Sequence, residues 1–205
     1  MHSSMRITGG SFRSRPLRAP RGSATRPTSD RVREALFGIL ASSGAIEGAR
    51  VLDLYAGTGA LALEALSRGA ASATLVETSR EALAAIRANV AALGVGDRAR
   101  VVPCDVRAAT RRLASFAPFD LLLADPPWAL VDSGDAVRAL AEMAAAGLLS
   151  AEALVVLEHA SRSSVPHVDG LEEVDTRAYG DTTLTFYKTG ILDRTRPKDA
   201  SSPSE

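Results

Sequence analysis

The segment that most constrains the fold is Val51–Ala60, Val-Leu-Asp-Leu-Tyr-Ala-Gly-Thr-Gly-Ala, which joins an apolar run to a glycine pair and then to a helical pattern. A strand that passes through a tight glycine turn into a helix is typical of open α/β sheets that bind nucleotide-like ligands. Gly57 and Gly59 lack Cβ atoms, so the backbone can bend sharply and a ligand can approach it. Asp53 lies inside the strand, where its carboxylate would repel a pyrophosphate and suits a ligand with a positive end.

Short apolar strands alternate with longer helices from residue 50 onward. Because this order is typical of βαβ units, it predicts a parallel sheet with right-handed crossovers. The last two strands form a hairpin with no helix between them, which predicts an antiparallel end. We therefore expect an α/β, Rossmann-like, seven-stranded and mostly parallel sheet. The expected strands are 50–55, 73–77, 99–103, 121–124, 154–158, 172–178 and 182–188, and the expected helices are 31–40, 60–67, 80–93, 106–114 and 135–146.

Length and composition fit one globular domain with extensions, since the 205 residues are 46% hydrophobic and carry no net charge. The single Cys104, read as a small buried residue, excludes an intramolecular disulfide and fits a reducing compartment. With no membrane span or signal peptide in the sequence, and with Met5 as an alternative start, we expect a cytoplasmic protein. Three scattered histidines predict no metal site, and the absence of a spare apolar helix face favours a monomer. The expected organisation is an arm over 1–28, a domain over 29–188 and a disordered tail over 189–205.

Residues 6–33 concentrate eight arginines against one acid, Asp30, in a chain that is neutral overall. Glycines and prolines interrupt the segment, so we expect a short β-hairpin or arm, followed by a helix with one apolar face that docks on the domain. Arginine is suited to bidentate phosphate contacts, which favours a nucleic-acid surface over the alternative of a solvated segment. Deletion of residues 1–26 is expected to weaken RNA binding and to spare the fold.

Acidic residues follow the second and third strands. Glu77 ends the second strand, where a carboxylate can accept hydrogen bonds from ribose hydroxyls. Asp105 follows the third strand, where it can accept from an adenine amino group or cap the next helix; the two roles are compatible.

The motif Asp125-Pro126-Pro127-Trp128 ends the fourth strand. The prolines stiffen the backbone and present carbonyl groups, so the Asp125 side chain and the Pro126 carbonyl can both accept from one exocyclic base amine. Holding both hydrogens frees the nitrogen lone pair for attack, and the carboxylate stabilises the developing positive charge. Trp128 would stack on a base that has left its helix. In isolation the motif fits a structural loop equally well.

Together these motifs resemble class I S-adenosylmethionine-dependent methyltransferases and, more narrowly, the bacterial 16S rRNA guanine-N2 methyltransferase family RsmD. The glycine turn at Gly57 and Gly59 is a feature of the whole class. The helix that begins near Arg31 and the turn Tyr179–Thr182 are more specific to the family. Trp128 departs from the Tyr or Phe usual in the family. The residues that carry the resemblance are Arg6–Gly10, Arg26–Phe37, Asp53–Ala70, Asp125–Trp128 and Tyr179–Thr182.

The resemblance implies that S-adenosylmethionine is the cofactor and 16S rRNA, within the small ribosomal subunit, is the partner. It implies a target guanine held by Asp125, Pro126 and Trp128. The implied cofactor contacts are Asp53, Tyr55, Ala56, Gly57, Gly59, Glu77, Asp105, Val106 and Asp125, and the implied RNA contacts are Arg6, Arg13, Arg15, Arg18, Arg26 and Arg31.

Three alternatives stay open. An amino-methyltransferase acting on adenine or cytosine in DNA or another RNA would use the same Asp-Pro-Pro-aromatic motif. An NAD-dependent dehydrogenase is suggested by the glycine turn followed by Glu77, although Asp53 and the missing second domain oppose it. A non-catalytic RNA-binding module on the same fold is opposed by the intact motif at Asp125.

Overall fold

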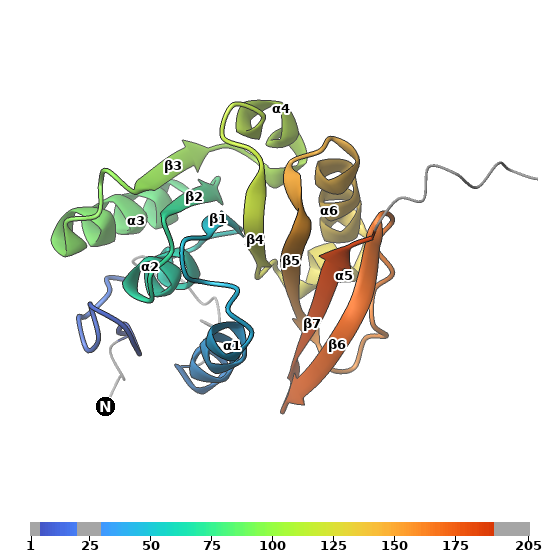
Figure 1. Cartoon of the computed structure of the whole chain (residues 1–205), viewed down its shortest axis with the longest axis horizontal. Coiled ribbons are helices and arrows are strands. Elements are labelled where there is room, and N and C mark those ends of the chain that lie inside the picture. Colours follow the sequence, from blue (N-terminus) through green and yellow to red (C-terminus); the bar gives the residue numbers. More distant parts are fainter. Residues whose placement is uncertain (1–4, 20–29, 191–205) are drawn as a thin grey trace, which may run out of the picture.

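The computed structural model describes residues 5–19 and 30–190, in which seven strands form one sheet in the order β3-β2-β1-β4-β5-β7-β6 (Figure 1). The first five strands are parallel, and β7 runs antiparallel between β5 and β6. The expected mostly parallel sheet with an antiparallel hairpin is thereby confirmed. The strands are β1 (Arg50–Leu54), β2 (Ser72–Glu77), β3 (Ala99–Pro103), β4 (Phe119–Ala124), β5 (Leu149–Ala160), β6 (Leu171–Tyr179) and β7 (Thr182–Thr189).

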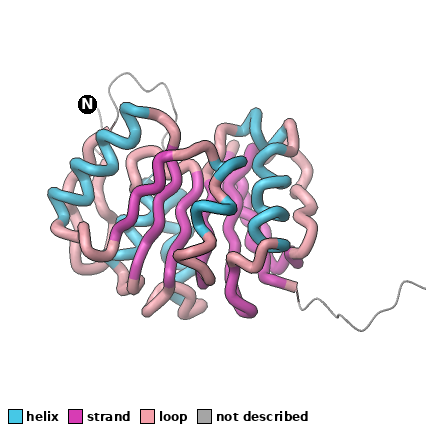
Figure 2. Tube along the Cα trace, turned by 90° about the horizontal axis from the view of Figure 1, so that it is seen from above, coloured by secondary structure: helices cyan, strands magenta, loops and turns pink. Residues whose placement is uncertain are grey.

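Helices cover both faces of the sheet, as the view from above shows (Figure 2). One hydrophobic core cluster is shared by α1 (Asp30–Ser42), α2 (Ala60–Ser67) and α3 (Arg80–Leu93). The other cluster is shared by a 3-10 turn (Val106–Ala108), α4 (Thr110–Leu113), α5 (Trp128–Asp132) and α6 (Asp135–Ala145). In the described part of the chain, no helix is long and apolar enough to cross a membrane.

The central strands β1 and β4 are buried on both faces, which is why they appear in the sequence as continuous apolar runs. Val51 and Leu121 point to the α1–α3 side, and the next residues, Leu52 and Leu122, point to the α6 side. All four side chains are 0% exposed. The carboxyl edge of this doubly covered sheet positions the polar residues that follow each strand.

The N-terminal segment 5–17 folds back on itself and docks on α2. A bridge pairs Arg6 with Pro16, as expected for a hairpin. Glu64, fully buried in α2, accepts hydrogen bonds from the backbone N–H groups of Thr8 and Gly9, both at 2.8 Å. Ile7 lies in the core, 1% exposed. Deletion of residues 1–26 would therefore remove part of the core, contrary to the expectation that it spares the fold.

Arg33 differs from the other arginines of this region because its side chain is 0% exposed. Its guanidinium donates to the Arg6 carbonyl at 2.6 Å and to Asp30 at 2.8 Å, and its Nε lies 3.7 Å from Glu64. It therefore joins α1, α2 and the N-terminal segment and does not belong to an exposed phosphate-binding surface. Residues 20–29, which include the end of the expected arm, and the tail beyond residue 190 lie outside the described residues.

Three elements differ from the expectation. The single helix over 106–114 is a 3-10 turn followed by α4, because the Asp105 side chain accepts the Arg107 N–H at 2.9 Å and closes a tight turn there. β5 begins at Leu149, five residues earlier than expected. α5 was not expected at all: Pro127 stands at its N-cap, where a missing N–H costs nothing.

Candidate active site

A cleft of about 1140 Å³ opens at the carboxyl ends of β1, β2 and β4. Ligands of open α/β sheets bind at this edge, beside the strand where the order reverses. The cleft brings together nearly all of the expected cofactor and target residues, namely Asp53, Tyr55, Ala56, Gly57, Glu77, Asp105, Val106, Asp125, Pro126 and Trp128.

Asp53 combines complete burial with an unsatisfied oxygen. Its Oδ2 accepts the Ala62 backbone N–H at 3.0 Å, whereas Oδ1 is buried and finds no hydrogen-bond donor among the described residues. Burial raises the pKa of Asp53 to about 8, and the nearby charges of Asp125 and Glu77 add to this. A buried carboxylate oxygen without a donor is costly, so this atom fits a cationic group supplied by a ligand.

The turn after β1 bends through three residues of positive φ, which are Tyr55 at 61°, Gly57 at 56° and Gly59 at 77°. Gly57 lines the cleft. Gly59 does not: a Cβ there would meet Leu75 at 3.0 Å, so this glycine permits close packing of the turn against β2. The two glycines therefore serve different purposes, although both were expected to contact the cofactor.

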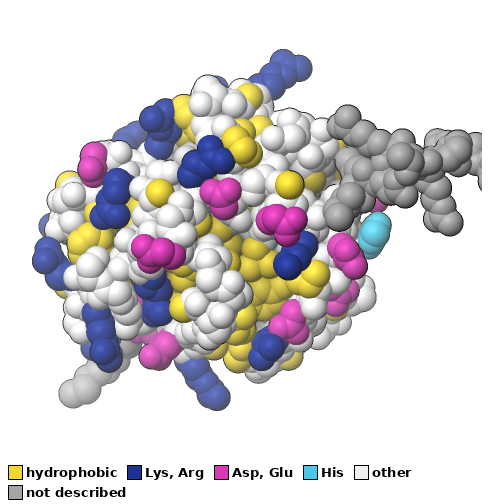
Figure 3. Space-filling model, in the orientation of Figure 1, with side chains coloured by type: hydrophobic (Ala, Val, Ile, Leu, Met, Phe, Trp, Pro, Cys, Tyr) yellow, Lys and Arg dark blue, Asp and Glu magenta, His cyan; other side chains and the backbone are white. Residues whose placement is uncertain are grey.

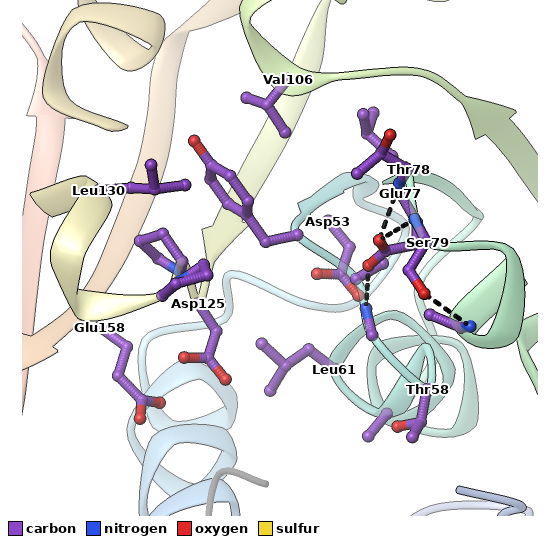
Figure 4. A pocket seen from close by; sticks show the side chains of 18 of the residues that line it. Asp53, Thr58, Leu61, Glu77, Thr78, Ser79, Val106, Asp125, Leu130 and Glu158 are labelled. Carbon is purple, nitrogen blue, oxygen red and sulfur yellow. Dashed lines mark hydrogen bonds between the residues drawn. The ribbon is translucent and has the colours of Figure 1, made fainter. Parts of the chain in front are cut away.

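Glu77 holds the turn as well as lining the cleft. Its Oε2 accepts the Gly57 N–H at 2.8 Å, and its Oε1 accepts the N–H groups of Thr78 at 2.7 Å and Ser79 at 2.8 Å (Figure 4). Carboxylate oxygens have further lone pairs, so these bonds leave Glu77 able to accept from ribose hydroxyls.

Asp105 caps the 3-10 turn and pairs with Arg107 through contacts of 3.1 and 2.7 Å. These hydrogen bonds from Arg107 lower the pKa of Asp105. The capping role weighed from the sequence is therefore present, and the neighbouring Val106 is buried in the cleft wall, 4% exposed. Cys104 also lines the cleft and is half-buried, whereas a buried residue was expected.

The segment after β4 carries the expected acceptor motif. Asp125 follows the strand directly, Pro126 is buried, and Trp128 begins α5. The guanidinium of Arg162 lies 5.6 Å from the centroid of the Trp128 ring. The half-buried indole thus lies at the cleft with a cationic neighbour.

Other residues that line the cleft were not selected from the sequence. Glu158 on β5 is 7% exposed and lies beside Asp125 in Figure 4. It was missed although it ends the expected fifth strand, so the strand-end argument used for Glu77 would have found it. Tyr179 and Thr182 enter from the β6–β7 turn, and Met5 from the N-terminal segment.

The described arginines expected to contact RNA do not line the cleft themselves, although Met5, Ala19 and Val32, which adjoin three of them in the chain, do. Arg6, Arg13, Arg15, Arg18 and Arg31 are exposed and do not line it, and Arg26 lies outside the described residues. On the face in Figure 3, Lys and Arg side chains gather mainly over the half that carries the N-terminal segment and α3. Among residues 5–19 and 30–190, no group of three His, Cys, Asp or Glu side chains is arranged to hold a metal ion.

Comparison with known proteins gives the family. A family model described as conserved hypothetical protein 95 matches residues 5–188. The ribosomal RNA small subunit methyltransferase D of Escherichia coli K12 is 38% identical over 164 residues, which cover 80% of this chain and 79% of that protein. YlbH of Bacillus subtilis, provisionally named an rRNA methyltransferase, is 33% identical over 90% of this chain and 98% of its own.

A solved structure agrees with these sequence matches. The structure of yhhF from Escherichia coli, provisionally named a methyltransferase, superposes with a TM-score of 0.75 and 36% identity, covering 91% of this chain and 98% of that one. The fold is thus that of class I methyltransferases. The match over residues 5–188 and the extent of these similarities show that the chain belongs to the conserved hypothetical protein 95 family, the RsmD family of methyltransferases.

Proposed function

We propose that this protein transfers a methyl group from S-adenosylmethionine to the exocyclic N2 amine of a guanine in 16S rRNA of the small ribosomal subunit. The observation that carries the proposal is that the Asp125-Pro126 acceptor pair shares one cleft with the buried, unsatisfied Asp53. The names of the relatives support a ribosomal RNA substrate.

The cleft fits this cofactor chemically. Asp53 Oδ1 would accept from the ammonium group, which meets the need of a buried carboxylate for a cationic donor. Glu77 would accept from the ribose, and Asp105 with Val106 would border the adenine. When bound, S-adenosylmethionine supplies the methyl group on a sulfonium, which is already a strong electrophile.

Asp125 and the Pro126 carbonyl would hold the two hydrogens of the target amine, so that the nitrogen lone pair points toward the methyl group. The nitrogen would accept the methyl group that the bound cofactor supplies, and the electron pair of the broken S–C bond would stay on sulfur. Asp125 stabilises the positive charge on nitrogen and takes the proton that must then leave, passing it to water. The protein would accelerate the reaction mainly by positioning the amine against the methyl group. Trp128 would stack on the extruded base.

Exposed arginines of the N-terminal segment and α1 would bind the rRNA backbone. The exposed side chains are those of Arg6, Arg13, Arg15, Arg18 and Arg31. Such phosphate contacts give affinity without base specificity, so the target would be chosen in the cleft. We propose that the protein acts as a monomer made of this basic segment and one methyltransferase domain.

The proposal is tested with small ribosomal subunits from cells that lack this protein. They are incubated with isotopically labelled S-adenosylmethionine, and the rRNA is digested to nucleosides for mass spectrometry. Label in N2-methylguanosine at one site is expected. Label in an adenine or cytosine amine, or in DNA alone, would overturn the guanine assignment, and no label in any acceptor would overturn the enzyme assignment.

A further inference from the structure

Four acidic residues of the cleft lie on or directly after neighbouring strands, and they follow the order of those strands in the sheet. Figure 4 shows Glu158 beside Asp125, with Asp53 and then Glu77 following toward β2. The proposed cofactor contacts occupy the β1–β2–β3 end of this row. The acceptor base must therefore lie at the other end, where β4 and β5 finish and where Glu158 remains without a role in the proposed reaction.

The sheet fixes Glu158 next to Asp125. Ala124, the last residue of β4, pairs with Leu157, so Asp125, which follows β4 directly, lies next to Glu158 on β5. Both side chains point to the α1–α3 face, because Leu123 and Val156, two residues earlier, pack in that core. Glu158 also pairs with Leu184 on β7, so strands on both sides hold it in place.

A flipped guanine presents a distinctive edge to this pair of carboxylates. Its N1–H and the two hydrogens of its N2 amine are three adjacent donors. Adenine, cytosine and 2-aminopurine instead carry an acceptor lone pair on the ring nitrogen beside the amine-bearing carbon. A carboxylate facing that ring nitrogen attracts guanine and repels the other three bases.

We propose that Glu158 is the specificity-determining residue for the target base, accepting the N1–H of guanine while Asp125 and the Pro126 carbonyl hold its N2 amine. Three donors then meet three acceptors. The hydrogen bond to Glu158 is charge-assisted and lies in a nearly water-free position, since Glu158 is 7% exposed. This inference rests on the proposed methylation of guanine and extends it to the choice of base.

The decisive variant is Glu158→Gln, assayed on two acceptors. Small subunits are reconstituted with rRNA that carries either guanosine or 2-aminopurine riboside at the methylated position. 2-Aminopurine keeps the amine and lacks the N1–H. The wild-type protein should prefer guanine by about 100-fold in kcat/KM, since each well-formed pair of base contacts is worth about 5- to 150-fold. The amide that replaces the carboxylate in this variant can donate to N1 of 2-aminopurine, so the preference should fall at least about tenfold.

The control is Glu152→Gln, which removes the same charge from the exposed start of β5. This variant should keep the wild-type preference. Cofactor binding and thermal unfolding of both variants show whether they fold. A Glu158→Gln protein that is folded and loses activity equally on both acceptors would overturn the inference, because a structural role lowers both rates together.

The two proposals fail separately. If wild-type protein does not methylate guanine, the proposed function fails whatever Glu158 does. If wild-type protein methylates guanine and accepts 2-aminopurine equally well, the function stands and the role of Glu158 is refuted.

Discussion

The Glu77 carboxylate at the end of β2 accepts the Gly57 N–H at 2.8 Å, so one strand end holds the glycine turn that follows its neighbour, β1. With the bonds from Thr78 and Ser79, Glu77 organises both turns that border the cofactor end of the cleft. Its importance therefore goes beyond any contact with a ribose.

Replacing Glu77 with Gln should loosen this turn, because an amide has only one acceptor oxygen for the three N–H groups. Affinity for S-adenosylmethionine should fall about two- to tenfold, since the Gly57 N–H is half-buried and the loss of one hydrogen bond costs about 0.5–1.5 kcal/mol. Calorimetric titration measures the change. The control Glu172→Gln alters an exposed carboxylate on β6 and should bind normally; an unchanged affinity in Glu77→Gln would contradict the organising role.

Cofactor binding should depend on pH through Asp53. Burial raises its pKa to about 8, so in the free protein a proton competes with the cofactor ammonium below that pH. Affinity should rise between pH 6 and pH 8, by at most about tenfold per pH unit. Asp53→Asn should bind weakly at pH 8 and lose this dependence. A flat pH profile in the wild-type protein would contradict the assignment.

The same pKa predicts how stability depends on pH without cofactor. A folded-state pKa above the ordinary 3.8 means that the fold favours protonated Asp53, so this contribution is complete below about pH 4 and is lost as pH rises to about 8. Denaturant titrations of wild-type protein and Asp53→Asn at pH 5 and pH 8 measure it. The variant should gain stability relative to wild type at the higher pH.

Asp125→Ala should abolish methyl transfer and leave cofactor binding nearly intact. The variant loses the carboxylate proposed to hold the amine and take its proton, which is expected to cost about 100-fold or more in kcat. It also removes one of the charges that raise the pKa of Asp53, so cofactor affinity should not fall. Single-turnover methylation and calorimetry separate the two effects; full activity would refute the proposed role.

Arg13→Ala and Arg18→Ala should weaken rRNA binding without unfolding the protein, because both side chains are exposed. Each should reduce the slope of log affinity against log salt by about 0.7 to 1, the value of one phosphate contact. Arg138→Ala on α6, on the opposite face of the sheet, is the control. Substitution is the appropriate test, since deletion would remove the buried Ile7 as well. An unchanged slope would show that these two arginines do not contact RNA phosphates.

The strands and the long helices could be predicted from the sequence because their apolar periodicity is strong. The bounds expected for α2 and α3 agree with the structure, and Ser79 and Gly94 mark both ends of α3. α5 could not be predicted, since five residues after two prolines carry too little periodicity. In the cleft, the sequence indicated residues near glycines or prolines, such as Asp53 and Asp125.

The sequence did not indicate contacts that depend on distant pairing. Nothing in the apolar sequence around Glu64 indicates that its carboxylate accepts a hydrogen bond from the backbone N–H of Thr8, 56 residues away. Glu158 is prominent only once the sheet brings β5 beside β4. Arg33 looks like its exposed neighbours until α1 packs against α2 and buries it. Each of these residues is polar within a helix or strand, and its role is set by the tertiary fold.

The position of α2 has a consequence for how the two proposed ligands affect each other. The Ala62 N–H in its first turn donates to Asp53, at the end of the cleft proposed for the cofactor. Glu64, two residues later, accepts a hydrogen bond from Thr8 in the N-terminal segment 5–17. A shift of this eight-residue helix thus reaches both ligand sites at once. Any such coupling is reciprocal, so a cofactor that tightens RNA binding by some factor must itself be bound more tightly by that factor when RNA is present. Under the proposed function, one short helix would therefore make the binding of the methyl donor and the binding of the rRNA thermodynamically interdependent.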